Sequence, residues 1–357
     1  TSGAADRNQS IMELTLQEAG RLLADSQSVV ISTHVLPDGD GLGAQIALFH
    51  YLVRCGKHAQ ILNPDPVPDR YKFVDLHGVI QVLDKSKKDG GLKNIDLAII
   101  VDTSDPRRIN GLWEIYTRIA KNVLVIDHHP NLEPHLNTSP SAKLHFLVDE
   151  KSSSIGELLY RLFHQAHDLL DSTSTTFRFS PEIALGLYVS IITDTNSFRY
   201  ARTTALSHRI AADLIDYGLQ PEEVYQNIYS TKSANHLRLI GEVLANVQET
   251  AGGHIAWVEI PLALRKKYGA SSDDTQSIVN FLLLLKQAEV LVLLREEDDG
   301  KIKASLKSKG TYFVNEIAME FGGGGHDFAA GFGAVGSMSE NCKKLVARLE
   351  KEFKKAS

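Results

Sequence analysis

The chain has 357 residues, which is too long for one ordinary hydrophobic core and suits two domains. Its two cysteines lie far apart and in no metal-binding spacing, which excludes a disulfide framework and favours a reducing, cytoplasmic setting. A formal net charge of −6 excludes a protein that coats long nucleic acid, but it is compatible with a small anionic substrate in a locally positive pocket.

No apolar run is long enough to span a bilayer, because charged and polar residues interrupt even the most apolar window, 281–294. Residues 1–10 lack the hydrophobic core of a signal peptide, and we expect them to form a disordered leader. We therefore expect no membrane partner.

Short apolar strands alternate with helices in the first part of the chain. The sequence predicts strands at 28–33, 59–63, 95–101, 122–126 and 144–148, and helices at 44–51, 154–167 and 181–192. The run at 95–101 is as apolar as a strand that is buried on both faces. This alternation indicates an α/β domain with a parallel, doubly wound sheet, which we place at 11–203.

The pattern then changes to helices at 204–217, 222–229 and 235–247 with no strand between them, which indicates a helical connector at 204–247. A smaller α+β domain is expected at 248–354. Its predicted elements are strands at 254–258, 290–294 and 301–307 and helices at 314–321 and 339–353.

Polar side chains follow several of the predicted elements directly. They are His34, Asp38 and Asp40 after the first strand, Asp102 after the third, Asp127, His128 and His129 after the fourth, and Asp194 after the helix at 181–192. Because the carboxyl ends of parallel strands meet at one edge of a sheet, we expect these side chains to converge. So many carboxylates would raise one another's pKa unless a cation neutralised them.

Carboxylates and imidazoles without a thiolate suit Mn²⁺, Mg²⁺, Co²⁺ or Zn²⁺, and the oxygen-rich share favours Mn²⁺. Two ions that share one bridging carboxylate would be the simplest arrangement for this many ligands. Gly39 and Gly41 are expected to let the loop turn tightly, so that Asp38 and Asp40 face different ions.

Each cluster alone has a simpler interpretation. Asp127, His128 and His129 could be a polar loop end, Asp38 a helix cap and Asp102 a turn residue. The clusters follow independent elements, and this coincidence favours one shared site.

A run of four glycines, 322–325, precedes His326 in the second domain. A flexible linker is the alternative, but an apolar helix before the run and small residues after it place it inside a folded unit. We expect its main-chain amides to form an anion nest, with His326 as a further donor. The alternating strand at 301–307 puts Lys303 and Lys307 on the face opposite the core, where they are either phosphate contacts or an ordinary solvated surface.

Taken in order, these motifs resemble those of the DHH/DHHA1 phosphoesterase family, over nearly the whole chain. The layout is similar to that of the bacterial nanoRNase/pAp phosphatases, which hydrolyse very short oligonucleotides (nanoRNA) and 3′-phosphoadenosine 5′-phosphate (pAp). The resemblance implies an active site in the cleft between the domains. It implies one metal on His34, Asp38 and Asp102, and a second on Asp40, Asp102, His128 and Asp194.

The resemblance also implies that Asp102 bridges the ions, that His129 faces the substrate phosphate and that Asp127 orients the imidazoles from behind. It implies that the glycine-rich segment with His326 holds the nucleotide. Together with the lysine face of the strand at 301–307, the expected substrate-binding residues of the second domain are Gly323, Gly324, Gly325, His326, Lys303, Lys307 and Ser308. Lys307 and Ser308 stand where the family often has arginine and serine, and lysine loses bidentate phosphate binding. A further nucleotide contact is expected from Arg199 or Arg202, with a surface arginine as the alternative.

The hypothesis is therefore a metal-dependent phosphodiesterase or phosphatase that hydrolyses nanoRNA, pAp or both. A phosphodiesterase for cyclic di-AMP or linear pApA would share all these motifs. A single-strand exonuclease would need an additional nucleic-acid-binding module, and a family II inorganic pyrophosphatase would have a basic motif in place of the glycine run. A non-catalytic nucleotide-binding module would lack metal ligands, and the oligomeric state stays open, with a homodimer as one alternative.

Overall fold

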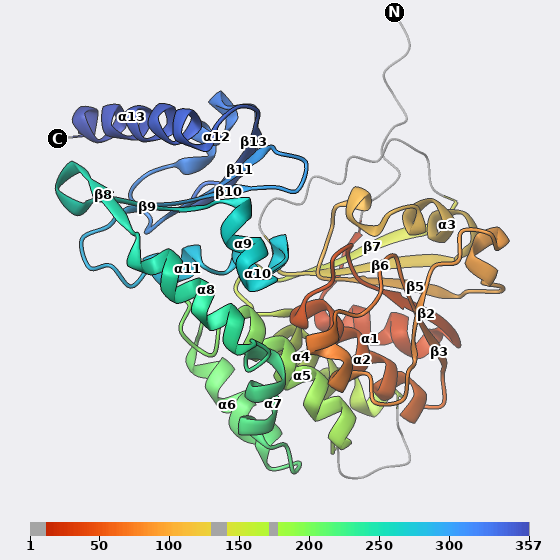
Figure 1. Cartoon of the computed structure of the whole chain (residues 1–357). Coiled ribbons are helices and arrows are strands. Elements are labelled where there is room, and N and C mark those ends of the chain that lie inside the picture. Colours follow the sequence, from red (N-terminus) through yellow and green to blue (C-terminus); the bar gives the residue numbers. More distant parts are fainter. Residues whose placement is uncertain (1–11, 130–140, 171–177, 357) are drawn as a thin grey trace, which may run out of the picture. The chain divides into compact units, whose positions relative to one another are not determined.

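The computed structural model describes residues 12–129, 141–170 and 178–356, in two compact units, one ending at Thr231 and the other beginning at Lys232 (Figure 1). The leader expected at 1–10 lies outside these ranges. Two of the predicted connector helices, α6 (Ala205–Ile215) and α7 (Pro221–Tyr229), belong to the first unit, and α8 (Ala234–Ala245) belongs to the second. None of the helices in the described ranges is long and apolar enough to cross a membrane.

The first unit contains the predicted parallel sheet, with the strand order β1-β7-β6-β5-β2-β3-β4 among the described residues. Every neighbouring pair in this order is parallel. The strands are β1 (Met12–Glu13), β2 (Ser28–Ser32), β3 (His58–Asn63), β4 (Ile80–Val82), β5 (Leu97–Val101), β6 (Asn122–Asp127) and β7 (Lys143–Val148).

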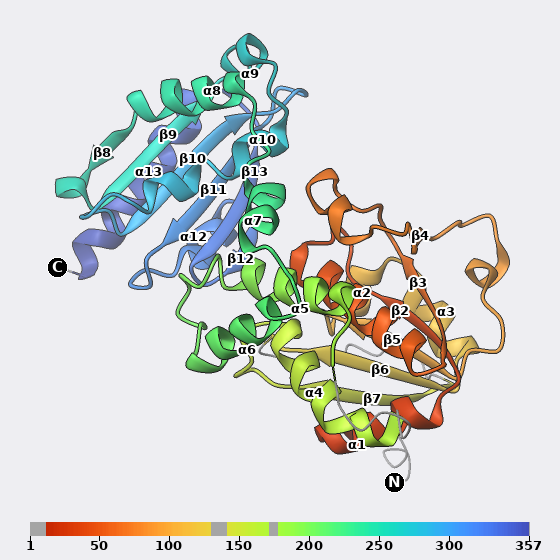
Figure 2. The same cartoon turned by 90° about the horizontal axis from the view of Figure 1, so that it is seen from below.

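Helices cover both faces of this sheet, as the apolar strands predict (Figures 1 and 2). In β5, Leu97, Ile99 and Val101 join the core on one face, whereas Ala98 and Ile100 join the core on the other. The first core is shared with α1 (Leu16–Asp25), α2 (Gly39–Arg54), α4 (Ile155–Leu170) and α5 (Pro181–Asp194), and the second with α3 (Leu112–Ile119).

The order of the strands reverses between β2 and β5. From β2, helix α2 leads to β3 on one side, whereas α3 leads from β5 to β6 in the opposite direction. Right-handed crossovers in opposite directions place their helices on opposite faces, which explains why α2 and α3 pack on different sides of the sheet. Open α/β sheets bind ligands at the carboxyl ends of the strands where the order reverses.

Helix α2 begins at Gly39, five residues earlier than predicted, and Asp38 caps it by accepting hydrogen bonds from the N–H groups of Asp40 and Gly41 at 3.0 and 3.3 Å. The expected tight loop at Gly39 and Gly41 is therefore wrong. Glycine is needed there for close packing, because a Cβ atom on Gly41 would lie 2.2 Å from the Thr33 hydroxyl.

The second unit has a mixed sheet in the order β12-β13-β11-β10-β9-β8, in which only β9 and β10 are parallel among the described pairs. Alternation in β11 is as predicted, since Ile302, Ala304 and Leu306 are buried against α12 and α13. The remaining elements are β8 (Gln248–Thr250), β9 (Ile255–Ile260), α9 (Leu262–Tyr268), α10 (Ser272–Gln276), α11 (Val279–Leu282), β10 (Val290–Glu296), β11 (Ile302–Ser308), α12 (Val314–Glu320), β12 (Gly324–His326), β13 (Ala329–Ala334) and α13 (Met338–Ala356).

Asp96 fastens the amino-terminal ends of three neighbouring strands. Its carboxylate accepts hydrogen bonds from the main-chain N–H groups of Gln27 and Ser28, at 3.1 and 3.0 Å, and from the Lys121 ammonium at 2.7 Å. The hydrogen bond from Lys121 and those from the main chain lower the pKa of Asp96 to about 2.

Replacing Asp96 by alanine should lower the free energy of unfolding by about 1–2 kcal/mol near pH 7, because it removes these hydrogen bonds. The pKa of Asp96 is lower in the folded state than its ordinary value of 3.8, so the stabilisation is present above that value and is lost as the pH falls toward 2. Urea unfolding of Asp96→Ala and the unsubstituted protein should therefore give converging free energies in acid. The exposed Asp25 serves as a control: Asp25→Ala should show no such convergence, and an equal Asp96→Ala difference in acid and at neutral pH would contradict the prediction.

Candidate metal centre

The predicted metal ligands meet at the carboxyl ends of β2, β5 and β6. They form two groups, and within each group the ligand atoms lie within 4.8 Å of one another: His34, Asp38 and Asp102, and Asp40, His128 and Asp194. Asp102 lies between them, with Oδ2 3.4 Å from His34 Nε2 and Oδ1 3.7 Å from His128 Nε2. A third group within the same distance consists of Asp102, His128 and His129.

Main-chain carbonyls fix the orientation of both inner imidazoles. The Nδ1 atom of His34 lies 2.7 Å from the Val35 carbonyl oxygen, and Nδ1 of His128 lies 3.2 Å from the Ser152 carbonyl oxygen. A carbonyl only accepts, so Nδ1 carries the proton and Nε2 keeps its lone pair in each neutral ring. Burial lowers the pKa of His34 and lowers that of His128 to about 4, so both rings are neutral at pH 7.

The carboxylates of this site repel one another in a buried setting. Asp40 and Asp102 are almost fully buried, and burial together with neighbouring carboxylates raises the pKa of each well above its ordinary value. Burial also raises the pKa of Asp194 to about 6, against an opposing effect of Arg202. Groups arranged in this way need a positive charge among them.

The donor atoms fit a divalent cation. Around Nε2 of His128, carboxylate oxygens of Asp40 and Asp194 lie at 3.3 and 3.6 Å, and the buried atoms His128 Nε2 and Asp194 Oδ2 have no hydrogen-bond partner among the described residues. Ligand atoms about 2.1 Å from a shared ion would be separated by about 3.0–3.4 Å in octahedral or tetrahedral geometry. The observed separations are close to this range. Acceptor atoms that face one another in this way are chemically suited to a cation.

Asp40 is held in place by α4 and α5. The main-chain N–H of Ile155, in the first turn of α4, lies 3.1 Å from both carboxylate oxygens, and the Ser190 hydroxyl donates to Oδ1. The amino-terminal end of a helix favours a carboxylate through its unpaired N–H groups and its dipole. Ser190 is 150 residues away from Asp40, and the sequence carries no local signal for either contact.

Glycines allow the three helices around Asp40 to approach closely. A Cβ atom on Gly43 in α2 would lie 2.3 Å from the Gly186 carbonyl oxygen in α5, and a Cβ atom on Gly156 in α4 would lie 2.5 Å from the Ser190 hydroxyl. A larger side chain at either position would separate the helices and move Asp40 away from its hydrogen-bond donors.

Asp127 orients only one of the two imidazoles that it was expected to orient. Its Oδ1 accepts hydrogen bonds from the main-chain N–H groups of His128 and His129 and lies 2.8 Å from Nδ1 of His129. The ring of His128 is oriented by the Ser152 carbonyl instead. Burial acts to raise the pKa of Asp127, but the hydrogen bonds from His129 and His128 outweigh it and leave that pKa below its ordinary value.

Left-handed backbone conformations occur at three points of the site, the first being Leu36, between His34 and Asp38, with a φ of 52°. Asp102, directly after β5, has a φ of 66°, and Asn196, Ser197 and Phe198, directly after α5, have φ values of 48°, 57° and 63°. Each such residue costs roughly 1–2 kcal/mol when it is not glycine. Strain of this kind is concentrated at functional sites, where it directs side chains.

The two candidate arginines that follow the turn at 196–198 have different hydrogen-bond partners. The guanidinium of Arg199 donates hydrogen bonds to the main-chain carbonyl and the side-chain oxygen of Asn196, at 2.9 and 3.0 Å. Arg202 instead donates to the His128 carbonyl at 3.1 Å and lies 3.6 Å from the Asp194 carboxylate. The structure therefore brings Arg202, and not Arg199, to the cluster.

In the second unit, the glycine run 322–325 is not the free loop that an anion nest requires. The N–H of Gly323 donates to the Ala318 carbonyl at 2.9 Å and closes α12, and the chain then continues as the edge strand β12 beside β13. A Cβ atom on Gly323 would lie 2.1 Å from the Gly331 carbonyl oxygen, so close strand approach requires the glycine. The side chain of His326 lies outside the part of the chain that the structure describes.

The other predicted substrate-binding residues of this unit differ in their surroundings. Lys303 is exposed, and Lys307 is partly buried, which lowers its pKa. The hydroxyl of Ser308 accepts hydrogen bonds from the N–H groups of Gly310 and Tyr312, at 3.3 and 3.2 Å, and thereby shapes the loop after β11.

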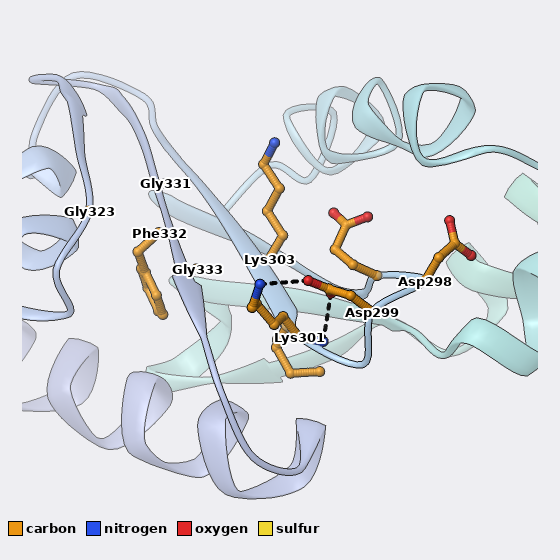
Figure 3. A pocket seen from close by; sticks show the side chains of 10 residues that line it. Asp298, Asp299, Lys301, Lys303, Gly323, Gly331, Phe332 and Gly333 are labelled. Carbon is orange, nitrogen blue, oxygen red and sulfur yellow. Dashed lines mark hydrogen bonds and ion pairs between the residues drawn. The ribbon is translucent and has the colours of Figure 1, made fainter.

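A cavity of about 710 Å³ lies beside the β10–β11 hairpin, between it and the glycine-rich strands. Figure 3 shows the Lys303 side chain extending away from its strand and the Lys301 side chain paired with Asp299, whose carboxylate oxygen lies 2.6 Å from the ammonium nitrogen. Acidic and basic side chains both line this cavity, so its charge alone does not identify a ligand.

Comparisons with known proteins agree with this geometry. Residues 28–191 match the DHH family, N-terminal domain, and residues 259–355 match the DHHA1 domain. Two curated relatives are each named bifunctional oligoribonuclease and PAP phosphatase NrnA. The protein from Thermus thermophilus is 26% identical over 92% of this chain and 91% of its own length, and that from Bacillus subtilis is 28% identical over 92% and 96%.

A solved structure of an exopolyphosphatase-related protein from Bacteroides fragilis superposes with a TM-score of 0.82 at 27% identity, covering 94% of this chain and 95% of the other. The two domain matches follow one another in the order that the sequence motifs predict. The chain belongs to the DHH/DHHA1 phosphoesterase family.

Proposed function

We propose that this protein hydrolyses short oligonucleotides and pAp with the help of two divalent cations, Mn²⁺ being the most suitable. The observation that carries the proposal is the pair of ligand groups on either side of Asp102, built on two neutral imidazoles. The names of the relatives from Thermus thermophilus and Bacillus subtilis support this choice of substrates.

In this proposal His34, Asp38 and Asp102 would hold one cation, and Asp40, Asp102, His128 and Asp194 would hold the other. The chemistry that such cations supply when bound is Lewis-acid activation of the phosphoryl group and of water. The protein contributes aligned ligands, because the Val35 and Ser152 carbonyls fix the two rings and Ser190 and Ile155 fix Asp40. These groups orient the proposed ligands through hydrogen bonds, as the residues around the ligands of known metal sites do.

His129 is the proposed contact to the reacting phosphate. The side chain is 42% exposed, whereas that of His128 is fully buried, so only His129 can reach a ligand from solvent. Asp127 holds its Nδ1, so Nε2 is the atom left to meet the substrate. When the ring is protonated, Nε2–H can donate to a phosphate oxygen or pass a proton to the leaving oxygen.

Replacing Asp102 by asparagine should abolish most of the turnover of pAp and of a 5′-phosphorylated dinucleotide, by on the order of 100-fold or more. Asparagine tolerates the left-handed backbone and removes a charge that both ligand groups share. Metal content after dialysis against Mn²⁺, measured by mass spectrometry, should fall as well. Because the substitution relieves buried repulsion, the melting temperature of the metal-free protein should be unchanged or higher.

Asp105→Asn is the matched control, three residues further along. Its carboxylate is bound to Arg107 and belongs to neither ligand group, so activity and metal content should stay close to those of the unsubstituted protein. Ordinary turnover by Asp102→Asn would contradict the proposed centre.

The preference for short substrates can be tested by comparing pAp, pApA, a dinucleotide and a long single-stranded RNA with added Mn²⁺. A net charge of −6 gives weak attraction to a long polyanion, so the rate per substrate molecule should be highest on the short substrates. The measurement is product release followed by chromatography. An equal or higher rate on the long RNA would indicate an exonuclease of longer strands instead.

A further inference from the structure

Arg202 has only two polar partners, His128 and Asp194, within the ranges that the structure describes. One nitrogen, Nη2, donates to the His128 carbonyl oxygen at 3.1 Å. The distance from Nη1 to Asp194 Oδ2 is 3.6 Å, which allows an ionic attraction but is too long for a hydrogen bond. A guanidinium offers five N–H donors in a planar fork, so most of them remain for a ligand.

The position of Arg202 relative to solvent and charge favours an anion as this ligand. The side chain is 35% exposed, enough for a ligand to reach it, yet it contacts the main chain of His128, whose side chain is fully buried. Asp194 is its nearest carboxylate, and Asp194 is also a proposed cation ligand. When Asp194 shares its charge with a cation, Arg202 is left with a weaker partner and can attract an added anion more strongly.

The backbone before Arg202 adopts an unfavourable conformation. Three consecutive residues other than glycine, Asn196, Ser197 and Phe198, are left-handed, and this turn reverses the chain after α5. Such a turn persists only where its surroundings over-determine it. One result of the reversal is that Arg202 faces Asp194, eight positions before it, while Arg199 is bound to the turn itself.

We propose that Arg202 is a substrate-binding residue that holds the nonbridging oxygens of the phosphate under attack. The inference rests on the proposed phosphoesterase function and adds a residue that none of the ligand groups contains. The fork of arginine matches two phosphate oxygens, which makes the contact bidentate and independent of the base.

The test uses the full chain with four substitutions: Arg202→Gln, Arg202→Lys, Arg199→Gln and Arg118→Gln. Arg202→Gln should weaken AMP binding in the presence of Mn²⁺, measured by calorimetry, by about 10- to 100-fold, and should raise KM for pAp by a similar factor. The AMP affinity of Arg202→Lys should lie between those of the unsubstituted protein and Arg202→Gln, because lysine keeps the positive charge but lacks the planar fork of donors. The loss of AMP affinity should be smaller for Arg199→Gln than for Arg202→Gln. Arg118→Gln removes a charge that is paired with Asp89, and this variant should bind AMP normally.

Titration with Mn²⁺ alone separates this role from a purely structural one. Removing a positive charge should leave Mn²⁺ affinity unchanged or slightly higher. Weaker Mn²⁺ binding by Arg202→Gln together with normal AMP binding would overturn the proposal, since Arg202 would then only position Asp194. Equal losses of AMP binding in Arg202→Gln and Arg199→Gln would overturn it as well. If the unsubstituted protein hydrolysed no substrate, the proposed function would fail, but the AMP titrations would still decide the role of Arg202.

Discussion

The mutual repulsion of carboxylates buried at one edge of a sheet governs the architecture of the first unit. Asp40, Asp102 and Asp194 lie close together where water is scarce, and each has a raised pKa. The fold counters this repulsion with a helix terminus at Asp40 and a guanidinium at Asp194. It adds imidazole rings, and among the described residues no lysine forms an ion pair with these three carboxylates, so the site is short of positive charge.

Much of this centre could be predicted because most of its residues directly follow a strand. A residue directly after a buried strand has its location fixed by the strand, and parallel strands share an edge. Asp102, His128 and the residues after β2 therefore required only the correct assignment of three strands. The structure brings His34, Asp38 and Asp102 together and brings Asp40, His128 and Asp194 together, and it also forms a group of Asp102, His128 and His129 that the family resemblance did not imply. The parallel sheet and the α+β second unit were predictable for the same reason, from apolar runs and alternation.

What could not be predicted depends on contacts between distant segments. Ser190 and the N–H of Ile155 reach Asp40 only because three helices pack at glycine crossings, and no local pattern reports such a crossing. The same limit applies to the glycines. The sequence suggested a tightly turning loop at Gly41 and an anion nest at 322–325, whereas the structure uses the lack of a side chain at Gly41 and Gly323 for close packing. The choice between Arg199 and Arg202 depended on a left-handed turn that composition does not reveal.

The two ends of the parallel strands have different roles, since one end stabilises the domain and the other carries the candidate metal centre. At one end the Asp96 carboxylate ties β2, β5 and β6 together through main-chain and ammonium donors. At the other end the same three strands deliver most of the proposed ligands, some of them at a cost in backbone strain. The two requirements are thereby separated in space: the hydrogen bonds of Asp96 hold the strands together at the edge opposite the strained backbone and the buried carboxylates.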